Sequence, residues 1–251
     1  MNTEFQAIYI MWLRQIKRFI RARSRVLAHI IQPFFFLVIF GFGFGSVRFP
    51  GLSGSYLNFF APGMVTMAVI FSSMFAGVSV LWDRQFGFLK EVLVAPVSRI
   101  SIVIGRTLGG STTALLQGFI VLTIASLLGV KINLLGLIPA VVFMILISFT
   151  FVSFGLAIAS KIEDFHGFQL IMNLLVMPLF FLSTAFFPIT GLPQFLKIIV
   201  YVNPLTYGVD GLRGSLTGLS FFPLYIDFIV VSIVCAFMLF LGSYLFKRME
   251  V

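Results

Sequence analysis

Long apolar segments separated by short charged stretches constrain this sequence more than any other feature. Of its 251 residues, 60% are hydrophobic and 10% are charged, whereas a soluble domain carries about 25% charged residues. One globular core cannot bury so much apolar surface, so a soluble fold is excluded and the surrounding solvent must be lipid. A chain of this length has room for about six helical spans of roughly 20 residues each.

The apolar segments predict an all-α integral membrane protein with six membrane-spanning helices. The spans cover about 26–47, 57–82, 107–130, 134–160, 168–190 and 222–246, within one transmembrane domain that comprises residues 1–251. We expect helices because a helix satisfies its own backbone hydrogen bonds in lipid. The single cysteine, Cys235, and the two histidines are too few to predict a metal site.

The basic residues separate onto two sides of the predicted spans. The chain has 17 Lys and Arg against 8 Asp and Glu, a net charge of +9. Thirteen lie on one side: Arg14, Lys17, Arg18, Arg21, Arg23, Arg25, Arg84, Lys90, Arg99, Arg106, Lys161, Lys247 and Arg248. The other side has Arg48, Lys131, Lys197 and Arg213. The positive-inside rule then places both termini in the cytoplasm. The charge excess indicates membrane lipids and a protein partner, and no nucleic acid.

Residues 1–25 are predicted to form a cytoplasmic helix that lies in the membrane interface. At about 100° per residue, one face is apolar and carries Phe5, Tyr9, Trp12, Ile16 and Phe19. The opposite face is basic and carries Arg14, Arg18, Arg21 and Arg25. Such a helix places its rings at the acyl boundary and its cations toward anionic headgroups. A basic leader that only sets orientation is the alternative.

The loop between the second and third spans contains a second amphipathic segment. Phe86, Leu89 and Leu93 recur at helical spacing, and Pro96 ends the predicted helix. The charged residues of this segment are Asp83, Arg84, Lys90 and Glu91. A short amphipathic helix between two spans suits insertion into a groove of a partner protein. Packing back against the bilayer is the alternative.

Residues 191–221, between the fifth and sixth spans, are too apolar for a free loop and predict two short helices. Asn203 is a suitable N-cap and Pro204 a suitable first residue for the second helix. We expect a re-entrant or surface-lying hairpin on the outer side of the membrane. Asp210 and Arg213 have the spacing of a helical ion pair, which we expect to be structural and exposed; contact with a substrate is the alternative.

The spans contain few polar groups. Their central parts lack Asp, Glu, Lys, Arg and His, so no proton or sodium relay is visible. The chain also lacks a Gly-x-x-x-x-Gly-Lys-Ser/Thr motif, so we do not expect it to be an enzyme that hydrolyses ATP. Energy for active transport would come from another polypeptide.

The amides Gln117, Gln169 and Asn173 face a pathway or a dimer seam, or form interhelical hydrogen bonds.

An ordered set of segments resembles the type-2 ATP-binding-cassette (ABC) exporter permeases. The segments are DRQFGFLKEVLVAPVSR at 83–99, FFAPG at 59–63, Phe187-Pro188, Leu192-Pro193, NPLTY at 203–207 and DGLR at 210–213. The stretch FFLSTAFFP at 180–188 is most similar to the drug-resistance export branch. Gln85 departs from the family, in which we expect a carboxylate at this position.

The resemblance implies that two permease subunits, as a homodimer, work with a separate nucleotide-binding ATPase that holds ATP and Mg²⁺. This chain would bind no cofactor. The interfacial helix would contact that ATPase together with the loop residues Asp83, Arg84, Phe86, Leu89, Lys90, Glu91, Leu93 and Pro96. The outer hairpin would close the exit through Asn203, Pro204, Tyr207, Asp210 and Arg213.

The implied function is export from the cytoplasm across a prokaryotic inner or plasma membrane. The chain has 33 Phe against 2 Trp and 6 Tyr, and sugar paths favour Trp and Tyr because their polar edges form hydrogen bonds. We therefore expect an amphipathic or hydrophobic substrate that is drug-like or lipid-like. A polysaccharide or glycolipid export permease and a non-transporting membrane anchor or assembly subunit are the alternatives.

Overall fold

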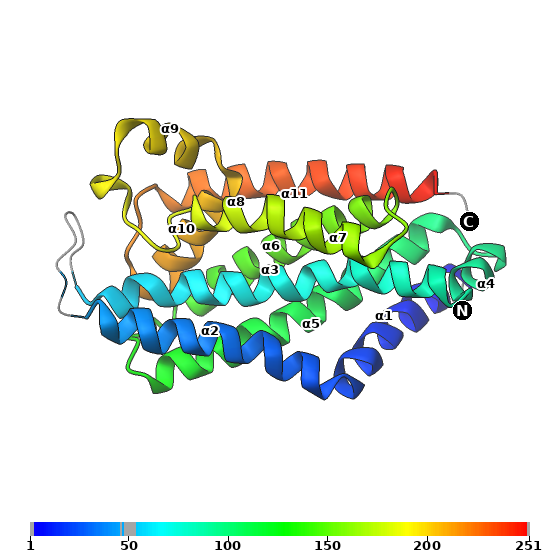
Figure 1. Ribbon diagram of the computed structural model, residues 1–251, viewed down its shortest axis with the longest axis horizontal. Helices are drawn as coiled ribbons and strands as arrows, with labels where there is room; N and C mark the ends of the chain where they lie inside the picture. The colour runs from blue at the N-terminus through cyan, green and yellow to red at the C-terminus, as the bar shows by residue number, and fades with distance from the viewer. Residues whose placement is uncertain (1–2, 46, 48–53, 250–251) are drawn as a thin grey trace.

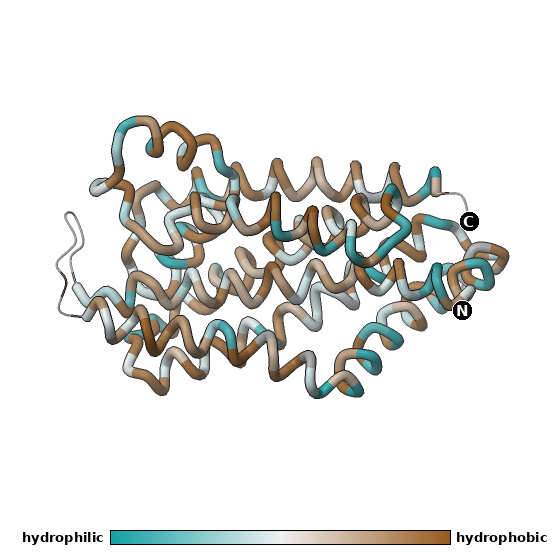
Figure 2. Tube along the Cα trace, in the orientation of Figure 1, coloured by the Kyte–Doolittle hydropathy of each residue, from teal (hydrophilic) through white to brown (hydrophobic). Residues whose placement is uncertain are grey.

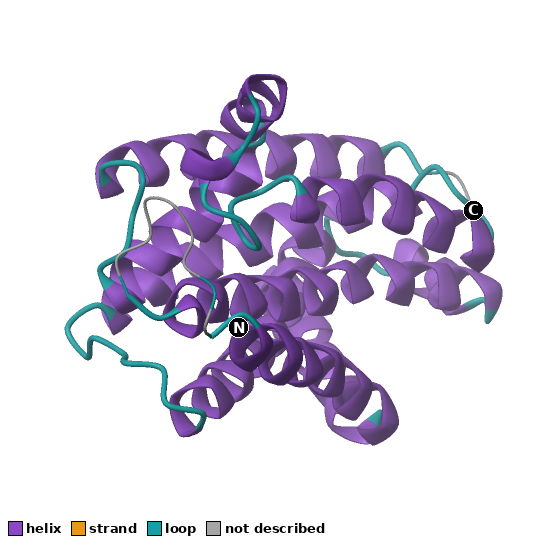
Figure 3. Cartoon of the chain, turned by 60° about the vertical axis from the view of Figure 1, so that its left-hand side comes forward, coloured by secondary structure: helices purple, strands orange, loops and turns teal. Residues whose placement is uncertain are grey.

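The computed structural model describes residues 3–45, 47 and 54–249, and the regular structure in these ranges is helical (Figures 1 and 3). The longer helices run side by side in an elongated bundle (Figure 1). Its elements are α1 (Thr3–Arg21), α2 (Arg23–Gly43), α3 (Tyr56–Gln85), α4 (Phe88–Val94), α5 (Arg99–Leu127), α6 (Leu137–Ala159), α7 (Phe165–Ile171), the π-turn η1 (Met172–Val176), α8 (Met177–Phe181), the 3₁₀ turn η2 (Ile189–Gly191), α9 (Gln194–Val202), α10 (Pro204–Thr217) and α11 (Leu224–Lys247).

Five of these helices are long and apolar enough to cross a membrane, namely α2, α3, α5, α6 and α11. The third begins at Arg99, earlier than the predicted 107, because the Ser98 side chain caps it by accepting a hydrogen bond from the Ser101 N–H. The fifth predicted span is a shorter apolar helix, Phe165–Phe181, made of α7, η1 and α8. The all-helical membrane fold is thus confirmed.

The predicted outer end of the fifth span, at residue 190, is wrong. The helix ends at Phe181, and the chain turns over 182–186. Ser183 competes with the helix for backbone groups, since its hydroxyl donates to the Phe180 carbonyl at 2.7 Å and accepts from the Ala185 N–H at 3.3 Å. Local hydrogen bonds of this kind favour a turn over continued helix.

The most buried helix, α3, lies at the centre of the bundle and packs on α2, α5, α6 and α10. It approaches α6 closely at Gly77, where a Cβ would overlap the backbone of Gly155. Small residues permit such contacts between helices in a membrane. The remaining spans are arranged around this central helix.

The two ends of the chain lie at the same end of the bundle (Figure 1). The Glu4 carboxylate accepts a hydrogen bond from the Ser98 N–H at 3.0 Å, and Arg99 donates to the Met249 carbonyl at 3.2 Å. Hydrophilic segments gather here around α1 and α4, whereas the middle of the long helices is mostly hydrophobic (Figure 2). This arrangement agrees with an even number of crossings, and the cytoplasmic placement of this end stays a prediction.

At the opposite end, α10 lies inside the bundle. It packs against α3, α6 and α11, and most of its residues are buried. Asn203 caps it by accepting from the Leu205 N–H at 3.0 Å, as predicted, and also donates to the Leu179 carbonyl at 2.6 Å. The surface-lying alternative does not fit α10, and insertion of α9 and α10 as a re-entrant hairpin stays a prediction.

Candidate functional site

A buried carboxylate joins three helices near the end of the bundle that holds the chain termini. Asp83, in the last turns of α3, accepts hydrogen bonds from Arg14 at 2.8 Å, Arg18 at 2.8 Å and Arg106 at 2.7 Å. Its side chain is 2% exposed and that of Arg106 is fully buried. Charge-assisted hydrogen bonds of this number compensate the desolvation of the carboxylate. The cluster therefore fastens α1 and α5 to α3.

The structure places these residues differently from what the sequence predicts. Asp83 is enclosed within the bundle, whereas Arg14 and Arg18 form ion pairs with Asp83 and keep 26% and 28% of their side chains exposed. Arg106 does not belong to a loop but lies inside α5. The signal that could have revealed the cluster is Asp83 itself, since a carboxylate at the end of an apolar span needs a cationic partner.

The amphipathic helix α1 packs on α5 instead of lying free in the interface. A Cβ on Gly105 would lie 2.7 Å from the Met11 Cβ, and one on Gly109 would lie 2.7 Å from the Gln15 Cβ. Trp12 donates from Nε1 to the Thr112 hydroxyl at 3.1 Å. The aromatic residues of the predicted apolar face therefore lie in two different environments. Trp12 contacts α5, whereas Phe5 and Tyr9 are exposed.

The short helix α4 follows α3 after Gly87, whose φ of +75° favours glycine. Leu89, one of the predicted coupling residues, is completely buried, so its side chain faces the bundle and anchors α4 there. Just before α4, Phe86 is 83% exposed, and Val94, the last residue of α4, is 85% exposed. Nothing in the described part of the chain covers these two apolar side chains.

Other predicted coupling residues lie around that exposed surface. Lys90, Glu91 and Pro96 are exposed, and Arg84 forms an ion pair with Glu163 at 2.7 Å. The Arg14 guanidinium lies 3.7 Å from the centre of the Phe88 ring. Arg14 therefore links α4 to the Asp83 cluster. The side chains of the predicted residues Leu93 and Arg25 lie outside the described part of the structure, and Arg25 belongs to α2, not to α1.

A second ion pair is enclosed at the opposite end of the bundle. Asp210 and Arg213 of α10 lie 3.0 Å apart, and both side chains are fully buried. The pair is confirmed, but its predicted exposure is wrong because α10 lies within the bundle. Arg213 also donates to the Phe59 carbonyl at 3.0 Å, and Asp210 accepts from the Phe221 N–H at 2.8 Å. This pair joins α10 to α3 and to the segment before α11.

The other predicted gate residues lie close by. Tyr207 donates its hydroxyl proton to the Tyr201 carbonyl at 2.8 Å, which ties α10 to α9, and Pro204 occupies the first turn of α10. Asp227, in the first turn of α11, is also buried, and neither of its carboxylate oxygens has a hydrogen-bond partner in the described residues. The predicted hairpin residues thus form one connected group at this end.

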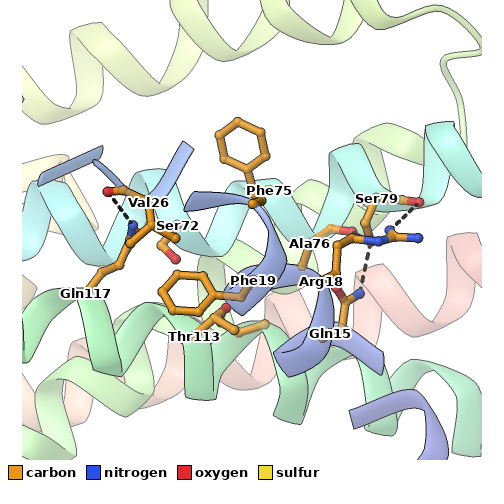
Figure 4. A pocket seen from close by; sticks show the side chains of 12 residues that line it. Gln15, Arg18, Phe19, Val26, Ser72, Phe75, Ala76, Ser79, Thr113 and Gln117 are labelled. Carbon is orange, nitrogen blue, oxygen red and sulfur yellow. Dashed lines mark hydrogen bonds between the residues drawn. The ribbon is translucent and has the colours of Figure 1, made fainter. Parts of the chain in front are cut away.

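The three predicted intramembrane amides fall into two places. Gln169 and Asn173 lie together, with the Gln169 amide nitrogen 3.5 Å from Asn173 Oδ1, and line a cleft of about 280 Å³. Gln32 from α2 and three methionines, Met67, Met172 and Met177, line the same cleft. Asn173 lies within η1, and π-turns are frequent at functional sites. Gln117 lies apart, in a recess between α1, α2, α3 and α5 (Figure 4).

Apolar spans around a central helix, with buried ion pairs toward both ends and an exposed amphipathic helix at one end, have the architecture of a multi-pass membrane permease. The chain belongs to the ABC-2 type transporter family, whose sequence profile matches residues 6–217. The resemblance seen in the ordered segments of the sequence is thereby confirmed.

Several curated relatives are transport permeases by name. The inner membrane transport permease YadH of Escherichia coli (strain K12) is 29% identical over 97% of this chain and 96% of its own length. The ycf38 transport permease of Cyanophora paradoxa is 29% identical over 88% of this chain and 81% of its own length. The doxorubicin resistance ABC transporter permease DrrC of Mycobacterium tuberculosis is 26% identical over 91% of this chain and 85% of its own length.

Proposed function

We propose that this chain is the membrane-spanning subunit of an ATP-driven exporter and that a separate ATPase subunit binds ATP and Mg²⁺. The observation that carries this proposal is the exposed apolar surface of Phe86 and Val94 beside α4. Exposed apolar side chains rimmed by charged ones are typical of protein docking sites, and Lys90 and Glu91 supply that rim. Membership of the ABC-2 family supports an ATPase as the partner.

Movement of a docked ATPase would reach the spans through the Asp83 cluster. Leu89 anchors α4 to the bundle, and Arg14 contacts both Phe88 and Asp83. Arg106 of α5 donates a hydrogen bond to the same Asp83 carboxylate, so α5 is linked to this group as well. Because buried ion pairs have strict geometry, a shift of α4 would displace α1, α3 and α5 together. We propose this unit as the transmission element between ATP hydrolysis and the membrane path.

The cleft of Gln32, Gln169 and Asn173 supports a homodimer with the substrate path at its seam. Gln32 and Asn173 are exposed on helices at membrane depth, where lipid cannot satisfy their amides. A second copy of the chain, or water in a shared path, would provide hydrogen-bond partners. The methionines beside them offer adaptable apolar contact. An amphipathic drug-like or lipid-like molecule matches this combination, and the name of the DrrC relative supports it.

The outer group of Asn203, Tyr207, Asp210 and Arg213 would close the exit of this path, with α10 as the moving part. Both termini would lie in the cytoplasm of a prokaryotic cell, and the inner-membrane location in the name of YadH supports that membrane. Export of a polysaccharide or glycolipid, and a role as a membrane anchor without transport, are the alternatives.

Reconstitution with a candidate ATPase subunit from the same organism tests the proposal. We expect ATP-dependent movement of an amphipathic dye in proteoliposomes, lost when Phe86 and Val94 are both replaced by alanine. Flux without ATP would indicate a passive channel. ATPase binding without any flux, across dye, lipid and oligosaccharide probes, would favour the anchor role.

A further inference from the structure

A polar recess opens where α1 meets α2 (Figure 4). Its volume is about 50 Å³, and its polar lining comes from Gln15, Arg18, Ser72, Ser79, Thr113 and Gln117. It adjoins a wider groove of about 650 Å³ whose polar lining is Arg14, Lys17, Arg18 and Arg21. Arg18 and Ala22 line both spaces, so the groove forms the mouth of the recess.

The mouth carries more positive charge than the protein itself compensates. Arg14, Arg18 and Arg106 share the single carboxylate of Asp83. Lys17 and Arg21 are exposed and form no ion pair within the described residues. Four cations, Arg14, Lys17, Arg18 and Arg21, thus line the groove, and the one carboxylate paired with two of them is also shared with the buried Arg106. An anion placed along this groove gains favourable electrostatic energy.

The floor of the recess contains a buried acceptor that nothing satisfies. Gln117 is 1% exposed, and its Oε1 has no hydrogen-bond partner in the described part of the chain. The Gln117 amide nitrogen lies 3.5 Å from the Val26 carbonyl oxygen (Figure 4). This contact orients the amide and leaves Oε1 without a hydrogen-bond donor. A buried acceptor of this kind calls for a donor from a ligand or water.

The position of the recess indicates a ligand that belongs to the membrane surface. The apolar part of α2 begins at Val26, which lines the recess. Ile10 and Ile20 on α1 are 60% and 63% exposed. Cations beside exposed isoleucines at the start of a span match the level of lipid headgroups. A fully soluble anion would leave these isoleucines uncovered.

We propose that the recess at the junction of α1 and α2 binds the headgroup of one anionic phospholipid that carries a hydroxyl, such as phosphatidylglycerol. Lys17, Arg18 and Arg21 hold the phosphate, and the Gln117 Oε1 accepts from a headgroup hydroxyl. Phosphatidylcholine has neither a net negative charge nor such a donor. The proposal is independent of transport and of the ATPase.

Native mass spectrometry of the full chain tests the site by titration with phosphatidylglycerol and phosphatidylcholine. We expect one preferentially bound phosphatidylglycerol per chain, with affinity reduced at least tenfold by the double change Lys17→Ala and Arg21→Ala. The matched control replaces Lys161 and Lys247, two exposed cations outside the recess, and should keep the affinity. Arg21→Gln alone should give a smaller loss in the same direction and serves if the double variant does not fold.

Gln117→Leu tests the floor of the recess separately. We expect it to weaken phosphatidylglycerol binding several-fold and to leave phosphatidylcholine binding unchanged. Equal losses in the control and recess variants would overturn the proposal, because they indicate diffuse attraction to the whole basic surface. Displacement of the lipid by millimolar inorganic phosphate would also overturn it and assign the site to a soluble phosphate compound.

Discussion

Asp83 Oδ2 lies 2.7 Å from Arg106 Nη2, and both side chains are buried where α3 passes α5. The same carboxylate also pairs with Arg14 and Arg18 of α1. One acidic side chain therefore joins α1 to both α3 and α5, in addition to the packing of α1 on Gly105 and Gly109. Because α4 starts shortly after Asp83, this attachment is also next to the surface that we assign to the ATPase.

Replacement of Asp83 by Asn should destabilise the bundle strongly. It would leave Arg106 buried without a counter-charge, at a cost of about 3–5 kcal/mol. Glu163→Gln is the matched control, since it breaks the exposed pair with Arg84, worth about 0–1 kcal/mol. Thermal unfolding in detergent measures both variants, and similar small shifts would contradict the structural role of the cluster.

The double change Phe86→Ala and Val94→Ala should abolish co-purification of the ATPase without altering thermal stability, because both side chains are exposed. Leu134→Ala is the control, an exposed leucine in the loop before α6. Leu89→Ala should instead lower stability by about 2–5 kcal/mol, as for other buried leucines. Retained ATPase binding in the double variant would reject α4 as the docking surface.

Acid should weaken the contact between Glu4, near the start of α1, and Ser98, which caps α5. Hydrogen bonds from the side chains of Ser101 and Ser98 lower the pKa of the Glu4 carboxyl below its usual value. The Glu4 contribution is therefore complete at neutral pH and is lost as pH falls through this lowered pKa. In a Trp82→Phe background, Trp12 fluorescence should report the loss as an acid transition. In Glu4→Gln the part of the transition that belongs to Glu4 should vanish, and an unchanged curve in that variant would refute the assignment.

Oxidative cross-linking tests the proposed seam. Cys235 is the only cysteine, so Cys235→Ser gives a background in which Asn173→Cys supplies one thiol within the cleft. We expect a covalent dimer on oxidation in membranes. Phe237→Cys, exposed on α11, is the control and should remain monomeric. Cross-linking through α11 alone would place the seam on another face.

Hydropathy predicted the spans well because lipid demands continuous apolar helices, but it could not place their ends. Ser98 extends α5 and Ser183 shortens the fifth span, both through local hydrogen bonds. The sequence predicts Arg106 in a loop and Arg213 in an outer hairpin, because a sequence shows a cation but not how deeply its ion pair is buried. Asp210 was found only because its partner lies one helical turn away.

The candidate site was predicted in part for the same reason. Helical spacing found the amphipathic helix at Phe86 and Leu89 but could not tell which of the two is exposed, because that depends on how α4 meets the bundle. Likewise, the wheel of α1 separated rings from cations correctly. It could not show that Gly105 and Gly109 create a groove on α5 that receives this helix.

The fifth crossing is unusually short, and this affects the membrane itself. Its three parts contain 7, 5 and 5 residues, which span about 25 Å at an α-helical rise, whereas the hydrocarbon core measures roughly 30 Å. Such a hydrophobic mismatch is relieved by local thinning of the bilayer. We expect lipids that border α7 and α8 to be compressed along the membrane normal, which would narrow the barrier to a molecule crossing there.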